Sequence, residues 1–178
     1  MSDLQFVVRR PGETLQERCP LPVVTVVLAL TNLVVFVFEL SLPASALQNF
    51  VEAWGVVPRE FALGRDLPPT IPLPFWTTLV TSMFLHGGWA HLFGNMLYLL
   101  IFGLHLERQL GGRRFLGFYL ICGVLAALAQ VSAHPFSDLP TVGASGAISG
   151  ALGGYVILYR VGTDEVVVAR IFHAREQR

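Results

Sequence analysis

The sequence is poor in charge and in cysteine, and lysine is absent from it. Charged residues make up 13% of the 178 positions, and the formal net charge is zero. A neutral chain offers no basic surface to a phosphate backbone, so we expect no nucleic-acid partner. The two cysteines, Cys19 and Cys122, provide neither a disulfide framework nor a metal-ligand spacing.

Apolar residues, by contrast, are abundant and gathered in long runs. They form 53% of the sequence, and the mean hydropathy is +0.60. A helix of about twenty residues rises about 30 Å, the thickness of a hydrocarbon core. The chain is therefore predicted to be an all-α, polytopic membrane helical bundle surrounded by a lipid bilayer. The expected spans are residues 21–40, 89–106, 115–132 and 144–159.

The segments between and around these runs differ in character. Residues 1–20 form a polar arm without a signal-peptide cleavage pattern, and residues 161–178 form a charged tail. Residues 41–88 hold too many prolines for a spanning helix and many aromatics, so we expect a folded, membrane-embedded loop. The positive-inside rule places the N-terminus, the second turn and the tail in the cytoplasm. The arginines used are Arg9, Arg10, Arg18, Arg108, Arg113, Arg114 and Arg160.

Polar side chains near the start of the second run are candidates for chemistry, because polar groups inside a membrane are costly. His91 and Asn95 are four residues apart and share a helix face, and His86 lies just before that helix. We expect the three to share a polar cavity at the non-cytoplasmic end. The two histidines lack the zinc-binding spacing and a third ligand, so no metal is expected.

Residues 143–150 read Gly-Ala-Ser-Gly-Ala-Ile-Ser-Gly at the start of the fourth run. Ser145 is expected at a helix N-terminus a few ångströms below the outer surface, where free amides favour a developing oxyanion. Its hydroxyl is expected to be buried and to face a hydrated pocket beside Asn95. Ser149 is the alternative nucleophile. The repeat of Gly146, Gly150 and Gly154 also fits a helix-packing face.

These motifs, in this order, resemble the rhomboid family of intramembrane serine proteases. The stretch 76–95 contains His-x4-His-x3-Asn, residues 107–111 with Phe115 and Tyr119 follow the family pattern, and residues 143–146 match Gly-x-Ser-Gly. The resemblance covers residues 20–160. It implies a six-helix core of which four helices are present, and cofactor-free hydrolysis of peptide bonds in or near transmembrane helices of membrane-protein substrates. It also implies a bacterial plasma membrane location, and it leaves the oligomeric state open.

The resemblance assigns roles to the candidate residues. Ser145 becomes the nucleophile, and His91 and Asn95 stabilise the oxyanion. His86 lines the cavity. The glycines that shape the site are Gly143 and Gly146.

The resemblance also implies a general base, a histidine on a sixth helix, and this base is absent from the expected spans. His173 lies among charged residues and is not expected to serve. We therefore expect an impaired enzyme, either truncated or frame-shifted, or a natural short member that binds transmembrane helices without cutting them. In either case the glycine face of the fourth span would lack a packing partner.

One further alternative remains from the residues. It is a transporter or channel fragment with a discontinuous helix at 143–146, which does not explain His-x4-His-x3-Asn. Ser149 occupies a position where several members of the family have tyrosine. Glu39 is expected at the membrane interface.

Overall fold

Apolar runs form helices in a bilayer because the backbone there must satisfy its own hydrogen bonds. The computed structural model describes residues 21–161, with side chains up to residue 154. Three helical stretches in this range are long and apolar enough to cross a membrane, judged by length and composition. They are α1 (Val23–Ser41), the continuous stretch α5 (Trp89–Tyr98), η3 (Leu99–Gly103, π-helical) and α6 (Leu104–Leu110), and α7 (Gly112–Ala133).

The predicted fold class, an all-α membrane helical bundle, is confirmed. The expected fourth span corresponds to α8 (Ser145–Val161), whose 17 residues are fewer than in each of the other three. At 1.5 Å per residue, α8 rises about 26 Å, slightly less than a hydrocarbon core. The arm 1–20 and residues 162–178, with Arg9, Cys19 and His173, lie outside the described residues.

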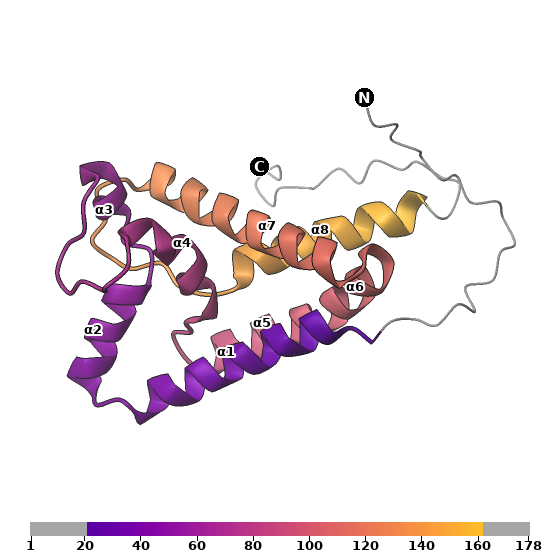
Figure 1. The fold of residues 1–178 in the computed structure, drawn as a ribbon, viewed down its shortest axis with the longest axis horizontal. Helices are drawn as coiled ribbons and strands as arrows, with labels where there is room; N and C mark the ends of the chain where they lie inside the picture. Colours follow the sequence, from indigo (N-terminus) through magenta and orange to yellow (C-terminus); the bar gives the residue numbers. More distant parts are fainter. Residues whose placement is uncertain (1–20, 162–178) are drawn as a thin grey trace, which may run out of the picture.

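Successive long helices run in opposite directions, roughly along the long axis of the molecule (Figure 1). We call the end that holds residues 41–88 and 134–144 the loop end. The opposite end, with residues 21–25 and 104–114, is the turn end. Chain order therefore brings the start of α5 and the start of α8 to the same loop end, although they are far apart in sequence.

Short helices fill the loop end. Two tight hydrogen bonds join the main chains of Val56 and Thr141, at 3.0 and 2.8 Å. The guanidinium of Arg59 also donates to both carboxylate oxygens of Asp138. The segment 41–88 thus holds the segment that leads into α8. Its helices are α2 (Ala44–Trp54), α3 (Pro58–Leu63), η1 (Phe75–Thr77), α4 (Thr78–Thr81) and η2 (Ser82–Phe84).

The glycine face of α8 packs against α7, which corrects the expectation that it would lack a partner. A Cβ added to Gly146 would collide with Ala126, and one added to Gly150 would collide with Cys122. Gly154, one turn further, faces Phe118. The partners step back along α7 by four residues as α8 advances by four, as expected of two antiparallel helices in close contact.

At the turn end, a side chain of α6 caps the first turn of α1. The Glu107 carboxylate is only 3% exposed and accepts the backbone N–H of Val24 at 2.9 Å. Its other oxygen accepts both the N–H and the hydroxyl of Thr25 at 2.7 Å. First-turn amides have no acceptor within their own helix, and a carboxylate there also suits the helix dipole. This contact fixes α1 to α6.

Candidate active site

The site begins at the loop that enters α5. His86 is buried, and its backbone N–H donates to the Glu39 carboxylate at 3.3 Å to each oxygen. Its ring lies edge-on to His91, with 5.2 Å between centroids. Burial lowers the pKa of His86 to about 4, and the neighbouring His91 lowers it further, against a bond to the Phe84 carbonyl that raises it. His86 is therefore neutral at pH 7.

The next residue along this loop orients His91. The N–H of Gly87 donates to Nδ1 of His91 at 3.4 Å. Since Nδ1 is the acceptor, a neutral imidazole carries its proton on Nε2. That edge of the ring lies against the main chain of Gly143: a Cβ built on Gly143 would stand 2.5 Å from Nε2.

Asn95 approaches the same glycine from the next turn of α5. Its side-chain Nδ2 would lie 3.6 Å from a Cβ on Gly143. Asn95 is 7% exposed, and this Nδ2 finds no acceptor within the described part of the chain. A buried donor without a protein partner is costly, and water or a ligand can supply the missing acceptor. Two N–H donors, from His91 and Asn95, therefore converge beside Gly143.

Gly143 needs the conformational freedom of glycine. Its φ is +112°, a region that residues with side chains rarely adopt, and a side chain would strike the His91 ring. Its N–H donates to the carbonyl of Ser82 at 2.8 Å. Segment 82–95 thus holds the start of the Gly-Ala-Ser-Gly stretch from two sides.

Ser145 is the first residue of α8, where the amides of the opening turn lack acceptors within the helix. Its side chain is exposed, which corrects the expectation of a buried hydroxyl. It lines a pocket of about 150 Å³ between α7 and α8, together with Gln130, Ser82 and Gly143. His86, His91 and Asn95, expected to share a cavity with Ser145, are not among the residues that line this pocket, although His91 and Asn95 both approach Gly143.

The second serine is engaged differently. The hydroxyl of Ser149 donates to the backbone carbonyl of Ser145 at 2.8 Å, a bond back along the helix. Attack through Ser149 would have to break this bond, whereas no residue among 21–154 hydrogen-bonds the hydroxyl of Ser145. The geometry therefore favours Ser145 as the available hydroxyl.

Sequence reasoning missed the residue that supports the histidines. Glu39, expected at the membrane interface, is 2% exposed and binds the amide of His86. The signal was present, because Glu39 is the one charged residue within the 19-residue helix α1, and ionisable residues inside spans default to functional roles. The contribution of the Ser82 carbonyl had no signal, because main-chain contacts leave no mark on composition.

Comparisons with known proteins agree on one family. The sequence model of the Rhomboid domain matches residues 74–172. YdcA, a rhomboid-family protein of Bacillus subtilis, is 36% identical over 137 residues, which cover 77% of this chain and 62% of YdcA. Rhomboid protease GluP of the same organism is 40% identical over 102 residues, covering 52% of this chain and 20% of GluP. RHOMBOID-like protein 6, mitochondrial, of Arabidopsis thaliana is 43% identical over 75 residues, covering 42% and 24%.

This chain thus spans less than two thirds of the length of these curated relatives. The comparison with solved structures found no significant match.

Proposed function

The chain belongs to the rhomboid family, and we propose that it is a serine endopeptidase that cleaves peptide bonds in or near transmembrane helices of membrane proteins. It is an integral membrane protein, consistent with its three long apolar helices. The observation that carries the proposal is the contact of Gly143 with both His91 and Asn95, two residues before Ser145. The proposed nucleophile, Ser145, begins α8, whereas the proposed oxyanion donors belong to α5. Both groups lie close to Gly143.

The roles follow from the atoms at the site. The Oγ of Ser145 attacks the substrate carbonyl, and the negative charge develops on the carbonyl oxygen. The Nδ2 of Asn95, the Nε2–H of His91 and the amide of Ser145 are the donors offered to that oxygen. Neutral His86 lies against the ring of His91, and the absence of a side chain at Gly143 and Gly146 allows the close approach of His91 and of Ala126. No cofactor takes part in this chemistry.

The proton of Ser145 must leave for the reaction to proceed. The histidines near the site do not supply this base: Nδ1 of His91 accepts from Gly87, and neither His86 nor His91 lines the pocket of Ser145. We propose that this chain by itself hydrolyses peptide bonds slowly, because no base within residues 21–154 hydrogen-bonds Ser145. His173 lies outside the described residues.

A second candidate function is a non-catalytic binder of transmembrane helices. It is favoured by one observation, that no histidine within residues 21–154 hydrogen-bonds Ser145. In this case the exposed Ser145 and its neighbouring pocket would contact a substrate helix without cutting it.

The location and the boundaries are also proposals. We place the chain in a bacterial plasma membrane with the N-terminus in the cytoplasm, on the arginine distribution. Residues 41–88 are proposed to lie embedded at the opposite face, because α2 is amphipathic: Gln48 and Asn49 are exposed, while Phe50 and Trp54 are half-buried.

A fluorophosphonate that reacts with activated serines tests the proposal on the full chain in detergent micelles. Labelling is expected at Ser145, and it should be slow because no base within residues 21–154 contacts this hydroxyl. It should be absent in Ser145→Ala, retained in Ser149→Ala and reduced about tenfold or more in Asn95→Ala, as for loss of one oxyanion donor. Labelling that persists in Ser145→Ala would overturn the assignment. No labelling, combined with photocrosslinking of a transmembrane peptide to residues 141–146, would favour the binder.

A further inference from the structure

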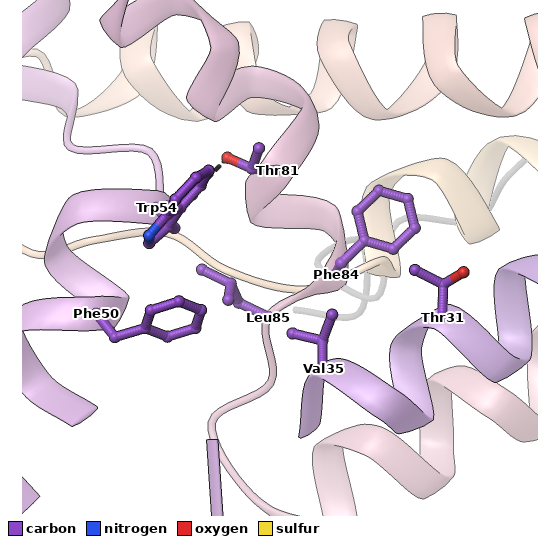
Figure 2. Close-up of a pocket in the computed structure, with 7 residues that line it drawn as sticks. All are labelled: Thr31, Val35, Phe50, Trp54, Thr81, Phe84 and Leu85. Atoms are coloured by element: carbon purple, nitrogen blue, oxygen red, sulfur yellow. Dashed lines mark hydrogen bonds between the residues drawn. The ribbon is translucent and has the colours of Figure 1, made fainter. Parts of the chain in front are cut away.

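A second cavity lies apart from the serine, between α1 and the loop end (Figure 2). Its volume is about 280 Å³. Thr31 and Val35 come from α1, and Phe50 and Trp54 come from α2. The remaining wall is formed by Thr81, Phe84 and Leu85, which precede His86. None of these residues has a role in the proposed reaction.

The surface of the cavity is almost entirely apolar. Its two hydroxyls are already used: Thr31 donates to the carbonyl of Val27 at 2.9 Å, and Thr81 donates to the carbonyl of Trp54 at 2.8 Å. The other walls are aliphatic or aromatic. Apolar cavities of this size do not hold ordered water, because water needs two to four polar partners. The occupant must therefore be hydrocarbon.

The position of the cavity indicates which hydrocarbon. Thr31, at its rim, is exposed, and the neighbouring surface of α1 is apolar and exposed, with Val27 53% and Val34 67% accessible. In an integral membrane protein such a surface faces lipid, so the cavity opens onto the bilayer. Thr31 is ten residues from the end of α1 at Ser41, which is about 15 Å, or half of a hydrocarbon core. The cavity therefore lies at the depth of the acyl chains of one leaflet.

The wall opposite α1 is formed by α2 and fits an acyl chain that enters the cavity from the headgroup level. Phe50 and Trp54 lie on the half-buried face of α2, and tryptophan favours the level of the headgroups. Phe50 also contacts Phe38 of α1, with 5.3 Å between ring centroids. A lipid whose headgroup lies at the level of α2 would direct one chain down past these rings towards Val35 and Thr31.

We propose that this cavity binds one acyl chain of a bilayer phospholipid, held between α1 and α2 independently of its headgroup. The bound chain completes the packing of α2 against α1 and supports Leu85, the residue before His86. The proposal rests on the membrane location of the chain and not on hydrolysis, so failure to label Ser145 leaves it intact.

Photocrosslinking from within the bilayer tests the proposal. The full chain is reconstituted in phosphatidylcholine vesicles that contain a phosphatidylcholine with a diazirine at the middle of one acyl chain. After irradiation, adducts are mapped by peptide mass spectrometry. We expect them to concentrate on residues 50–54 and 81–85. A carrier of phosphatidylglycerol is expected to leave the pattern unchanged.

A matched pair of variants separates the cavity from ordinary lipid contact. Val35→Phe fills the cavity, whereas Val34→Phe adds the same bulk on the exposed face of the same helix. Excluding about two methylenes should reduce the cavity adducts about tenfold or more in Val35→Phe, since each buried CH2 contributes about fourfold in affinity. Val34→Phe should retain them. If Val35→Phe does not fold, Thr31→Phe narrows the same rim from an exposed position.

Adducts spread evenly over the exposed residues of α1, or cavity adducts that persist in Val35→Phe, would overturn the proposal. So would labelling by a free fatty acid carrying the same diazirine when the phospholipid gives none.

Discussion

The two ends of α1 are each held by a buried glutamate, and they are held differently. At the turn end, Glu107 accepts three hydrogen bonds of 2.7 to 2.9 Å from Val24 and Thr25. At the loop end, Glu39 accepts a single N–H, that of His86, at 3.3 Å to both oxygens. Short, multiple bonds to a carboxylate are the strong ones.

Four buried side-chain atoms lack a hydrogen-bond partner among the described residues, and two of them, the Oδ1 of Asn32 and the hydroxyl of Tyr119, lie within the bundle. The other two, the Nδ2 of Asn95 and the Nε2 of His86, belong to the candidate site. All three donors facing Glu107 are satisfied. Binding sites can keep unsatisfied polar atoms, here the donor Nδ2 of Asn95 and the acceptor Nε2 of His86, for their ligands at some loss of stability. The turn end is therefore the anchor of the bundle, and the loop end is the part arranged for binding.

The largest effect should come from removing the anchor. Glu107→Ala leaves the N–H groups of Val24 and Thr25 and the hydroxyl of the fully buried Thr25 without an acceptor. At about 1–3 kcal/mol for each buried unsatisfied group, partly recovered by relaxation, the free energy of unfolding should fall by about 4 kcal/mol. Titration with SDS in mixed micelles, followed by circular dichroism, measures it.

Arg108→Ala is the control for that variant. Arg108 is the next residue on α6 and is exposed, so its removal should change the free energy of unfolding by less than about 0.5 kcal/mol. If the free energy of unfolding falls as much in Arg108→Ala as in Glu107→Ala, the loss does not come from the buried carboxylate. Glu107 would then not be the anchor.

A smaller effect is expected from a matched pair of glycines, one at each end. Gly111 and Gly143 both have positive φ, +80° and +112°. A Cβ at Gly111 meets nothing within 4 Å, whereas a Cβ at Gly143 strikes the ring of His91. Gly111→Ala should therefore cost only backbone strain, about 1 kcal/mol, while Gly143→Ala adds a clash and should cost about 3 kcal/mol.

The same SDS titration compares the two glycine variants, and fluorophosphonate labelling adds a functional readout. Labelling of Ser145 should fall in Gly143→Ala because the displaced His91 no longer faces the oxyanion. Gly111→Ala should label as the parent chain does. A Gly143→Ala variant that keeps both stability and labelling would contradict the arrangement of His91 against Gly143.

The lengths of the apolar runs predict the helical bundle and its turn end better than they predict the contacts at the loop end. Spans are readable because a bilayer demands a minimum length of apolar helix, which α1 and α7 meet. His91 and Asn95 could be paired because helix periodicity is local. The exposure of Ser145, in contrast, depends on how α8 leans on α7, and no local pattern specifies that contact.

The loop end also depends on main-chain contacts over long separations. The bonds between Val56 and Thr141, and between Gly143 and Ser82, use backbone atoms that every residue has. No side-chain pattern could announce them. Glu39 is the exception, because a lone carboxylate in an apolar helix was visible in the sequence and its importance was underestimated.

A weaker effect should follow changes at Glu39. Glu39→Ala removes one long hydrogen bond and should lower the free energy of unfolding by about 1–2 kcal/mol. Glu39→Gln keeps an acceptor oxygen for the His86 amide and should recover most of the loss. Amide hydrogen exchange at His86 should accelerate in the alanine variant and stay slow in the glutamine variant.

The identical exchange at the other end sharpens the comparison. Glu107→Gln should recover little, because the amide NH2 that replaces one oxygen would face a donor from Val24 or Thr25. If glutamine rescues both positions equally, the two glutamates are equivalent and the division between anchor and binding end fails.

The smallest effect at neutral pH concerns the ionisation of His86. Burial lowers its pKa from 6.5 to about 4 in the folded chain. Below pH 6.5 the unfolded chain therefore binds a proton that the folded chain does not bind, so the free energy of unfolding falls as the pH drops from 6.5 towards 4 and is level above 6.5.

His86→Gln should remove this part of the slope in SDS titrations between pH 4 and 8, whereas His134→Gln, on the exposed loop after α7, should keep it. The ionisable groups in contact with His86, Glu39 through its amide and His91 through its ring, are present in both variants, so the difference between the two slopes isolates the imidazole. Parallel slopes would mean that His86 is hydrated and protonates freely in the folded chain, and the loop end would then be open to water in the absence of substrate.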